Sequence, residues 1–212
     1  MRPQALFFDL DDTLYPRSSG IWTGVRSRIE QYMHERLNIP ARGITALRDE
    51  LLATYGTTLQ GLMATYQVDP DDYLLYVHDL PIEDMLRPNA RLNKMLADLP
   101  QQKWIFTNAS LEHARRVLGA LGVSRYFNGI VDIKAMGFRN KPQPEAYLMA
   151  LDSTGLPAAA CLFADDQARN LDPAKQLGMS TVLVGTREPH PAADYSVSVI
   201  EELLEVVPGL VE

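Results

Sequence analysis

The chain has 212 residues, of which 46% are hydrophobic and 22% charged, a composition typical of a soluble globular protein with a core of its own. Its 20 Lys and Arg against 27 Asp and Glu give a formal net charge of −7, which disfavours binding to a nucleic acid polymer. A small phosphate ester is not excluded, because a bound metal ion can invert the local field.

The sequence also predicts a cellular location. The single cysteine, Cys161, lies in the apolar run "AAACLFA", so no disulfide can form within the chain, which fits a reducing compartment. The start "MRPQALFFDLDD" reaches carboxylates too soon for a signal peptide, and no apolar run approaches the ~20 residues that span a bilayer. We expect a cytoplasmic protein without a membrane segment, as a monomer or weak dimer.

Taken in chain order, strand and helix patterns alternate over most of the sequence. Short apolar runs predict five buried strands: Ala5–Leu10, Lys103–Thr107, Gly129–Ile133, Cys161–Ala164 and Thr181–Val184. Helical patterns lie between most of them, at "NARLNKMLADL", "SLEHARRVLGALG", "PEAYLMALDSTG" and "NLDPAKQLG". This alternation predicts an α/β fold with a Rossmann-like three-layer core and a mostly parallel sheet.

Residues 16–86 break the alternation, because they show helical patterns and no convincing strand. Apolar residues recur there at a spacing of four: Ile21, Val25, Ile29 and Met33. Asp69 followed by Pro70 predicts a helix N-terminus. We expect residues 1–15 and 87–212 to form a core and residues 16–86 a helical insertion; the alternative is that these helices are another face of the same core.

Three acids, Asp9, Asp11 and Asp12, follow the first predicted strand. Residues two apart in extended chain face the same side, so Asp9 and Asp11 can share a site. Neighbouring carboxylates are costly unless a proton or a cation lies between them, which indicates a shared proton or a divalent metal. A solvent-facing loop is the structural alternative.

Polar residues of complementary kinds follow two later strands and one loop. Thr107 and Asn108 end a buried strand before a helix, where a hydroxyl and a backbone N–H form an anion site. Asp165 and Asp166 follow another apolar strand, and oxygen ligands of this kind suit a hard cation. Lys141 precedes a helix opened by proline. Each alone has a structural explanation, but together they describe a phosphoryl-transfer site with nucleophile, anion cradle, countercharge and metal.

In this order the motifs resemble those of the haloacid dehalogenase superfamily, over the whole chain. They stand here as Asp9-Leu10-Asp11-Asp12-Thr13, Thr107-Asn108, Lys141, and Asp165-Asp166 with Asn170. The insertion resembles the helical C1 cap of that superfamily. Further stretches resemble its pyrimidine 5′-nucleotidase family: "FFDLDDTLYP", "YGTTLQGLM", "LPIEDMLRPNARL", "FTNASLEHARRVLGALG", "NKPQPEAY" and "FADDQARNLDPAKQLGM". Gln167 is a departure, since that family more often has Ser there.

The resemblance implies a reaction and its two central residues. Asp9 attacks phosphorus and forms an aspartyl-phosphate. Asp11 protonates the leaving alcohol and then activates the water that hydrolyses the intermediate. The substrate is a small-molecule phosphate ester, with UMP and CMP favoured, although relatives also use other small phosphates.

The resemblance also implies how metal and phosphate are held. Mg²⁺ is bound by the Asp9 carboxylate, the backbone carbonyl of Asp11 and Asp166. The phosphate oxygens are held by residues of the second and third motifs: Thr107, the Asn108 N–H and Lys141. Asp165 and Asn170 support the metal site.

The insertion contains one polar, glycine-containing stretch, Tyr55–Met63, that we expect to recognise the leaving group. Thr57, Thr58 and Gln60 could pair with the polar edge of a base, and Gly56 and Gly61 could let the backbone approach it. The alternative is a plain turn between two helices.

Other functions share parts of this pattern. A response-regulator receiver domain has an acid cluster with Thr/Ser and Lys, but it needs neither a helical insertion nor an acid at the position of Asp11. A dehalogenase has no leaving alcohol to protonate, so Asp11 argues against it as well. A sugar phosphate mutase shares all four motifs and stays open.

Overall fold

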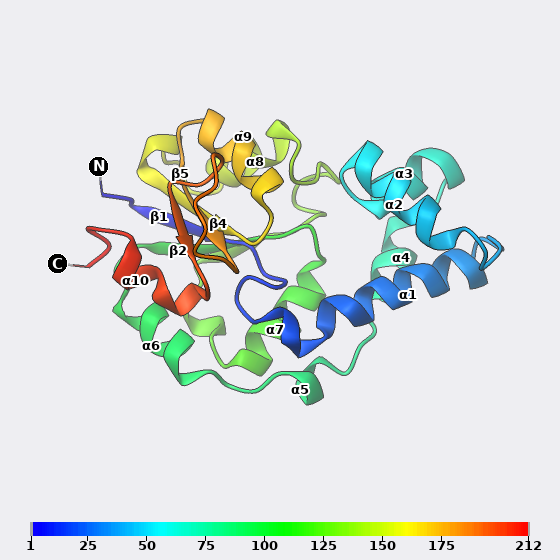
Figure 1. Cartoon of the computed structure of the whole chain (residues 1–212), viewed down its shortest axis with the longest axis horizontal. Helices are drawn as coiled ribbons and strands as arrows, with labels where there is room; N and C mark the ends of the chain where they lie inside the picture. The colour runs from blue at the N-terminus through cyan, green and yellow to red at the C-terminus, as the bar shows by residue number, and fades with distance from the viewer. Residues whose placement is uncertain (1, 212) are drawn as a thin grey trace.

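The computed structural model describes residues 2–211 and contains a six-stranded sheet (Figure 1). The strands are β1 Ala5–Phe8, β2 Gln102–Phe106, β3 Gly129–Val131, β4 Cys161–Asp165, β5 Ser180–Val184 and β6 Tyr195–Val197. Their order is β3-β2-β1-β4-β5-β6, and every pairing is parallel. The chain thus leaves β1 for β2 on one side and reaches β4 on the other, which places the switch point of the sheet beside β1.

Helices cover both faces of this sheet, which confirms the predicted three-layer α/β core. Figure 1 shows α8 and α9 on one side of the sheet and α6, α7 and α10 on the other. Their bounds are α6 Ala90–Asp98, α7 Leu111–Leu121, α8 Pro144–Asp152, α9 Ala168–Gln176 and α10 Leu203–Val206. Short 3₁₀ turns complete the core at Ser124–Tyr126, Ala158–Ala160 and Ile200–Glu202. The predicted caps form: Ser110 accepts the His113 N–H at the start of α7, and Gly122 ends it in the left-handed region.

A 3₁₀ turn and five further helices lie between β1 and α6. They are Arg17–Ser19, α1 Ile21–Glu35, α2 Ile44–Tyr55, α3 Thr58–Tyr66, α4 Pro70–Val77 and α5 Ile82–Met85. Figure 1 shows α1 to α4 to one side of the sheet, where α1 packs on α4 and α2 on α3. α5 packs on α7 instead. Asp69 caps α4 by accepting the Asp71 N–H at 2.8 Å, as its pairing with Pro70 predicts.

Several element bounds differ from those expected. The first strand is four residues long and ends at Phe8, so Asp9 begins the loop rather than continuing a strand to Leu10. β6 was not predicted, because three residues are too short to show a period. None of the helices formed by residues 2–211 has the length and hydrophobicity that crossing a bilayer requires.

Candidate functional site

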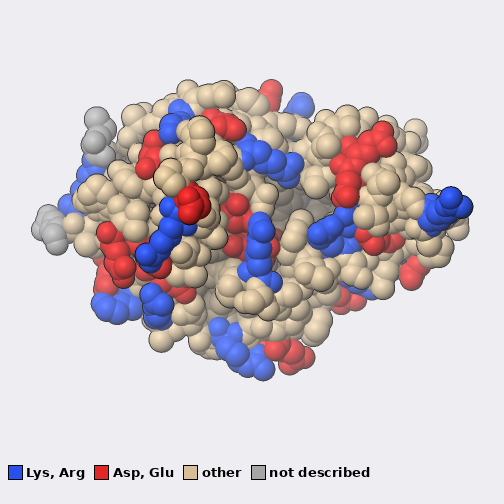
Figure 2. All heavy atoms as spheres, in the orientation of Figure 1, with Lys and Arg blue, Asp and Glu red and all other residues tan. Residues whose placement is uncertain are grey.

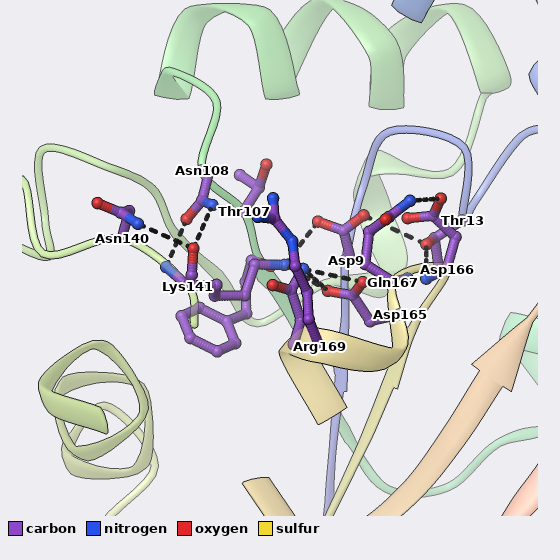
Figure 3. A network of polar contacts seen from close by, with 12 residues as sticks. Asp9, Thr13, Thr107, Asn108, Asn140, Lys141, Asp165, Asp166, Gln167 and Arg169 are labelled. Atoms are coloured by element: carbon purple, nitrogen blue, oxygen red, sulfur yellow. Dashed lines mark hydrogen bonds and ion pairs between the residues drawn. The ribbon is translucent and has the colours of Figure 1, made fainter. Parts of the chain in front are cut away.

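The candidate site lies at the carboxyl ends of β1, β2 and β4, beside the switch point of the sheet. Asp9 directly follows β1, Thr107 directly follows β2, and Asp165 is the last residue of β4. Because the three strands are parallel neighbours, their polar ends meet at one edge (Figure 3).

Lys141 is the buried centre of this cluster. Its side chain is 1% exposed, and Nζ donates to Asp9 Oδ1 at 2.7 Å, to Asp165 Oδ2 at 2.8 Å and to the Phe106 carbonyl at 2.8 Å. Burial acts against the charge, but Asp165 and Asp9 outweigh it and raise the pKa of Lys141. Lys141 is therefore not the solvated surface charge that a lone lysine usually is.

Asn108 fixes the backbone that carries this lysine. Its side-chain amide donates to the Lys141 carbonyl at 3.0 Å and accepts from the Lys141 N–H at 2.8 Å (Figure 3). Asn140 donates to the same carbonyl at 2.9 Å. The sequence predicted a role only for the Asn108 backbone N–H; the paired amide adds a positioning role for its side chain.

Thr13 and Asn170 orient the acids. The Thr13 hydroxyl donates to Asp9 Oδ2 at 3.2 Å and accepts from the Asp166 N–H at 3.1 Å. The Asn170 amide donates to both oxygens of Asp165, at 3.1 and 3.0 Å. Asp165 is thus engaged by Asn170 and Lys141, which fits the supporting role expected for it.

The acids fit a divalent metal ion. Carboxylate oxygens of Asp9, Asp165 and Asp166 lie within 4.8 Å of one another. Burial and the neighbouring acids raise the pKa of Asp9 despite Lys141, and burial and Asp165 raise that of Asp166 despite Arg17, so this cluster favours an added positive charge. An all-oxygen donor set is the one Mg²⁺ prefers.

The carboxylate of Asp11 is not part of that cluster. Asp11 Oδ1 accepts from His113 Nε2 at 2.8 Å and from the Tyr15 hydroxyl at 2.5 Å. Burial acts to raise the pKa of Asp11, but His113 and Tyr15 lower it to about 2. The Asp11 carboxylate is thus engaged away from the acid cluster, and a metal contact by the Asp11 backbone carbonyl stays a prediction. His113 was not predicted from the sequence; its signal was a histidine on the first turn of the helix that follows Thr107.

A cavity of about 350 Å³ opens from this cluster toward the helices between β1 and β2. Figure 2 shows the surface hollowed between these two parts of the molecule. The catalytic candidates line its floor: Asp9, Asp11, Thr107, Asn108, Lys141 and Asp166. Aromatic and aliphatic side chains of the helices line its far wall: Trp22, Val25, Ile29, Leu52, Leu59, Tyr73, Leu74 and Val77. Arg26, Arg48 and Asp49 of these helices line the cavity as well, so it offers a polar end for a phosphate and a mixed apolar and charged wall for a leaving group.

The structure brings only part of the predicted recognition stretch to this cavity. Gly56, Thr57, Thr58 and Leu59 line it, whereas Gln60 and Gly61 are not among its lining residues. A Cβ at Gly61 would lie 2.7 Å from the Leu51 side chain, so Gly61 allows α3 to pack closely on α2. Thr57 also caps α3, which shows that this stretch forms a helix–helix turn while four of its residues line the cavity.

Comparisons with known proteins agree with this geometry. Residues 3–178 match the haloacid dehalogenase-like hydrolase family. "Phosphate metabolism protein 8" of Saccharomyces cerevisiae is 28% identical over 85% of this chain, which spans 61% of that protein. "Glyceraldehyde 3-phosphate phosphatase" of Methanocaldococcus jannaschii is 24% identical over 98% of each chain.

Solved structures share the fold. A HAD phosphatase from Thermococcus onnurineus has a TM-score of 0.65 at 19% identity, covering 97% of each chain. β-Phosphoglucomutase from Clostridium difficile has a TM-score of 0.64 at 19% identity, covering 95% of this chain and 93% of that one. The sequence match, the fold and the cluster around Asp9 lead to one conclusion: this chain belongs to the haloacid dehalogenase-like hydrolase family.

Proposed function

We propose that the chain is a Mg²⁺-dependent phosphatase that hydrolyses small phosphate esters through a phosphorylated Asp9 and prefers UMP and CMP. The observation that carries this proposal is the pairing of Asp9 with Lys141 on the cavity floor, beside an Asp11 that is anchored separately. Relatives named glyceraldehyde 3-phosphate phosphatase and phosphoglycolate phosphatase support the reaction class, hydrolysis of phosphoric monoesters. We propose with it the division into a core of residues 1–15 and 87–212 and a cap of residues 16–86.

The first step is transfer of the phosphoryl group to the protein. A carboxylate oxygen of Asp9 forms a bond to phosphorus while the ester P–O bond breaks, and the leaving oxygen takes a proton from Asp11. A substrate phosphate placed in the cavity adds negative charge beside Asp11 and favours its protonated form. Lys141 already donates all three Nζ hydrogens, so in this arrangement it acts on the phosphate through its charge.

The second step returns Asp9 to its free state. Asp11, now ionised, removes a proton from water; the water oxygen bonds to phosphorus, and the bond to Asp9 breaks to release inorganic phosphate. The pKa of about 2 keeps Asp11 ionised at neutral pH once it has given up its proton, which is the form that can accept one from water. Mg²⁺, held by Asp9 and Asp166, would supply positive charge to offset repulsion between the carboxylate and the phosphate.

The cavity walls support a nucleoside leaving group. Trp22 and Tyr73 offer flat apolar surfaces, and Thr57 and Thr58 offer hydroxyls that can pair with a base edge. A volume of about 350 Å³ lies within the range of ligand pockets, roughly 300–1,000 Å³, which is room for a small phosphate ester.

A phosphate-release assay tests the proposal. The panel contains UMP, CMP, AMP, GMP, phosphoglycolate, glyceraldehyde 3-phosphate and p-nitrophenyl phosphate, each with Mg²⁺ and with EDTA. We expect kcat/KM for UMP and CMP to exceed that for AMP and GMP by about tenfold or more, because a mismatched base leaves buried polar groups unpaired. Equal rates on purine and pyrimidine nucleotides would remove the nucleotide preference while leaving the phosphatase assignment intact.

A variant separates the covalent route from other routes. Asp9→Asn is expected to abolish both phosphate release and covalent labelling of the protein, whereas Asp98→Asn, on the exposed surface of α6, should preserve both. A mutase would instead convert a sugar phosphate to its isomer without net phosphate release. Undiminished turnover by Asp9→Asn would contradict the aspartyl-phosphate intermediate.

A further inference from the structure

His113 reaches the site from the first turn of α7. Its side chain is 0% exposed, and Nε2 lies 2.8 Å from Asp11 Oδ1. An ionised carboxylate can only accept, so in this contact Nε2 carries the hydrogen. His113 is thus a buried donor aimed at the carboxylate assigned above to proton transfer.

The hydrogen bonds to Asp11 are asymmetric. Tyr15 donates to Oδ1, the same oxygen that His113 contacts. Among the described residues no side chain or backbone group donates to Oδ2, and Asp11 lines the cavity with 15% of its side chain exposed. Anchoring through one oxygen therefore fixes the carboxylate and leaves the other oxygen available to a ligand.

The surroundings hold the imidazole ring in place. The His78 ring stacks on it, with centroids 4.3 Å apart and planes at 21°. Ser110 Oγ lies 3.2 Å from His78 Nδ1 and accepts the His113 backbone N–H at 3.3 Å. His78 follows α4, so the stack joins the helices between β1 and β2 to the core at this point.

The other ring nitrogen gives an independent indication. Nδ1 of His113 is buried and has no hydrogen-bond partner among the described residues. A buried polar atom without a partner destabilises the folded protein, so packing alone would be served better by an apolar side chain. The contact between Nε2 and Asp11 is the feature that justifies a histidine at this position.

We propose that His113 is a positioning residue that, with Tyr15, clamps Oδ1 of Asp11 so that Oδ2 faces the leaving oxygen of the substrate. The inference rests on the proposed function, because it assigns the support of its acid–base group. No proton passes through His113 in this role; its hydrogen bond fixes where Asp11 points.

The positioning role of His113 is tested by how strongly its replacement affects kcat/KM for substrates with good and poor leaving groups. His113→Leu removes the donor at similar volume, whereas the amide of His113→Gln can restore it. We measure kcat/KM, which reports the steps up to formation of phospho-Asp9, for p-nitrophenyl phosphate and for the best alkyl phosphate of the panel. General acid catalysis typically raises a rate ~10²–10⁴-fold, and a displaced acid should lose part of this gain. We therefore expect His113→Leu to lower kcat/KM by about 10–100-fold for the alkyl ester. The loss for the nitrophenyl ester, whose leaving group needs little protonation, should be under threefold. His113→Gln should recover most of the loss.

A double variant tests whether His113 acts through Asp11. In the Asp11→Asn background, adding His113→Leu should change kcat/KM by less than twofold, because residues acting as a unit are not additive. Equal losses on both esters, or a full additional loss in the double variant, would overturn the positioning role and leave a structural one. If His113→Leu does not fold, as judged by circular dichroism, Tyr15→Phe serves the same comparison.

Failure of this inference differs from failure of the proposed function. If the unmodified protein releases phosphate from no ester of the panel, the proposed function fails. If it does release phosphate, and His113→Leu or Tyr15→Phe shows no leaving-group dependence, only the positioning role fails.

Discussion

Asp12 carries two features that disfavour a negative charge. Its Oδ1 is buried without a hydrogen-bond partner among residues 2–211, and burial together with Asp166 raises its pKa from 3.8 to about 6, although exposed Arg17, 3.5 Å from Oδ2, acts to lower it. Its backbone is in the left-handed region, at φ 60°, which Asn tolerates as well as Asp. We therefore expect Asp12→Asn to stabilise the protein at neutral pH without altering the backbone.

The pH dependence of this gain has a defined sign. A carboxyl whose folded pKa is raised is neutral in both states below about pH 4, and it costs stability progressively as pH rises toward 6. The Tm difference between Asp12→Asn and the unmodified protein should grow between about pH 4 and 6 and stay level above. Thermal unfolding in EDTA from pH 4 to 8 measures it; a difference independent of pH would contradict the buried-charge explanation.

A second prediction concerns the stability that Lys141 gives to the buried acids. Lys141→Met leaves Asp9 and Asp165 buried without their cation, and breaking a buried ion pair costs about 3–5 kcal/mol. Lys175→Met is the matched control, because Lys175 pairs with Asp194 at the surface at 2.9 Å, where such pairs are worth about 1 kcal/mol or less. Urea unfolding in EDTA compares the two. Similar small losses would show that Lys141 does not hold the cluster together.

At the scale of elements, the sequence could predict strand ends but not contacts between distant elements. The acids after β1 and β4 and the Thr after β2 were predictable, because parallel strands bring their carboxyl ends to one edge whatever the loops do. The partner of Asp11 was not, because His113 lies 102 residues further along the chain and meets it only after α7 packs. Gln60 was misleading for a related reason: its polarity showed neither where α3 begins nor which side faces the cavity.

The turn between α2 and α3 is one place where the helices between β1 and β2 touch the core. Gly56 has φ 84°, its carbonyl accepts from Arg169 at 3.4 Å, and a Cβ there would lie 2.4 Å from Asn140 Nδ2. We expect Gly56→Ala to push α2 and α3 away from the site and to lower kcat/KM for UMP by about tenfold or more, since small displacements of bound groups have large effects on rate.

A second glycine provides the control for backbone strain. Gly43 has φ 102°, and a Cβ there would meet no atom within 4 Å. Gly43→Ala therefore introduces similar strain without the clash, and it should lower Tm while leaving kcat/KM within about twofold. If the two variants lose activity equally, strain rather than the contact with Asn140 explains the effect.

At the scale of the whole molecule, an acidic chain concentrates acids around its cavity. The formal net charge is −7, and the carboxylates of Asp9, Asp165 and Asp166 converge at one edge of the sheet. Repulsion among them is present only in the folded state, so a cation that binds there stabilises that state by mass action. When the cation concentration is 100 times its dissociation constant, binding raises the free energy of unfolding by about 2.7 kcal/mol, a change that thermal unfolding detects.

We therefore expect Tm to rise with Mg²⁺ concentration in the unmodified protein when ionic strength is held constant with NaCl. Asp166→Asn should flatten this dependence by removing a ligand, whereas Asp98→Asn, whose carboxylate pairs with Lys94 at the surface, should retain it. Screening by salt acts on all exposed charges alike, so it cannot distinguish these two variants at matched ionic strength. Equal Tm shifts in both would place the metal ion elsewhere, and no shift in the unmodified protein would contradict a Mg²⁺ site at this cluster.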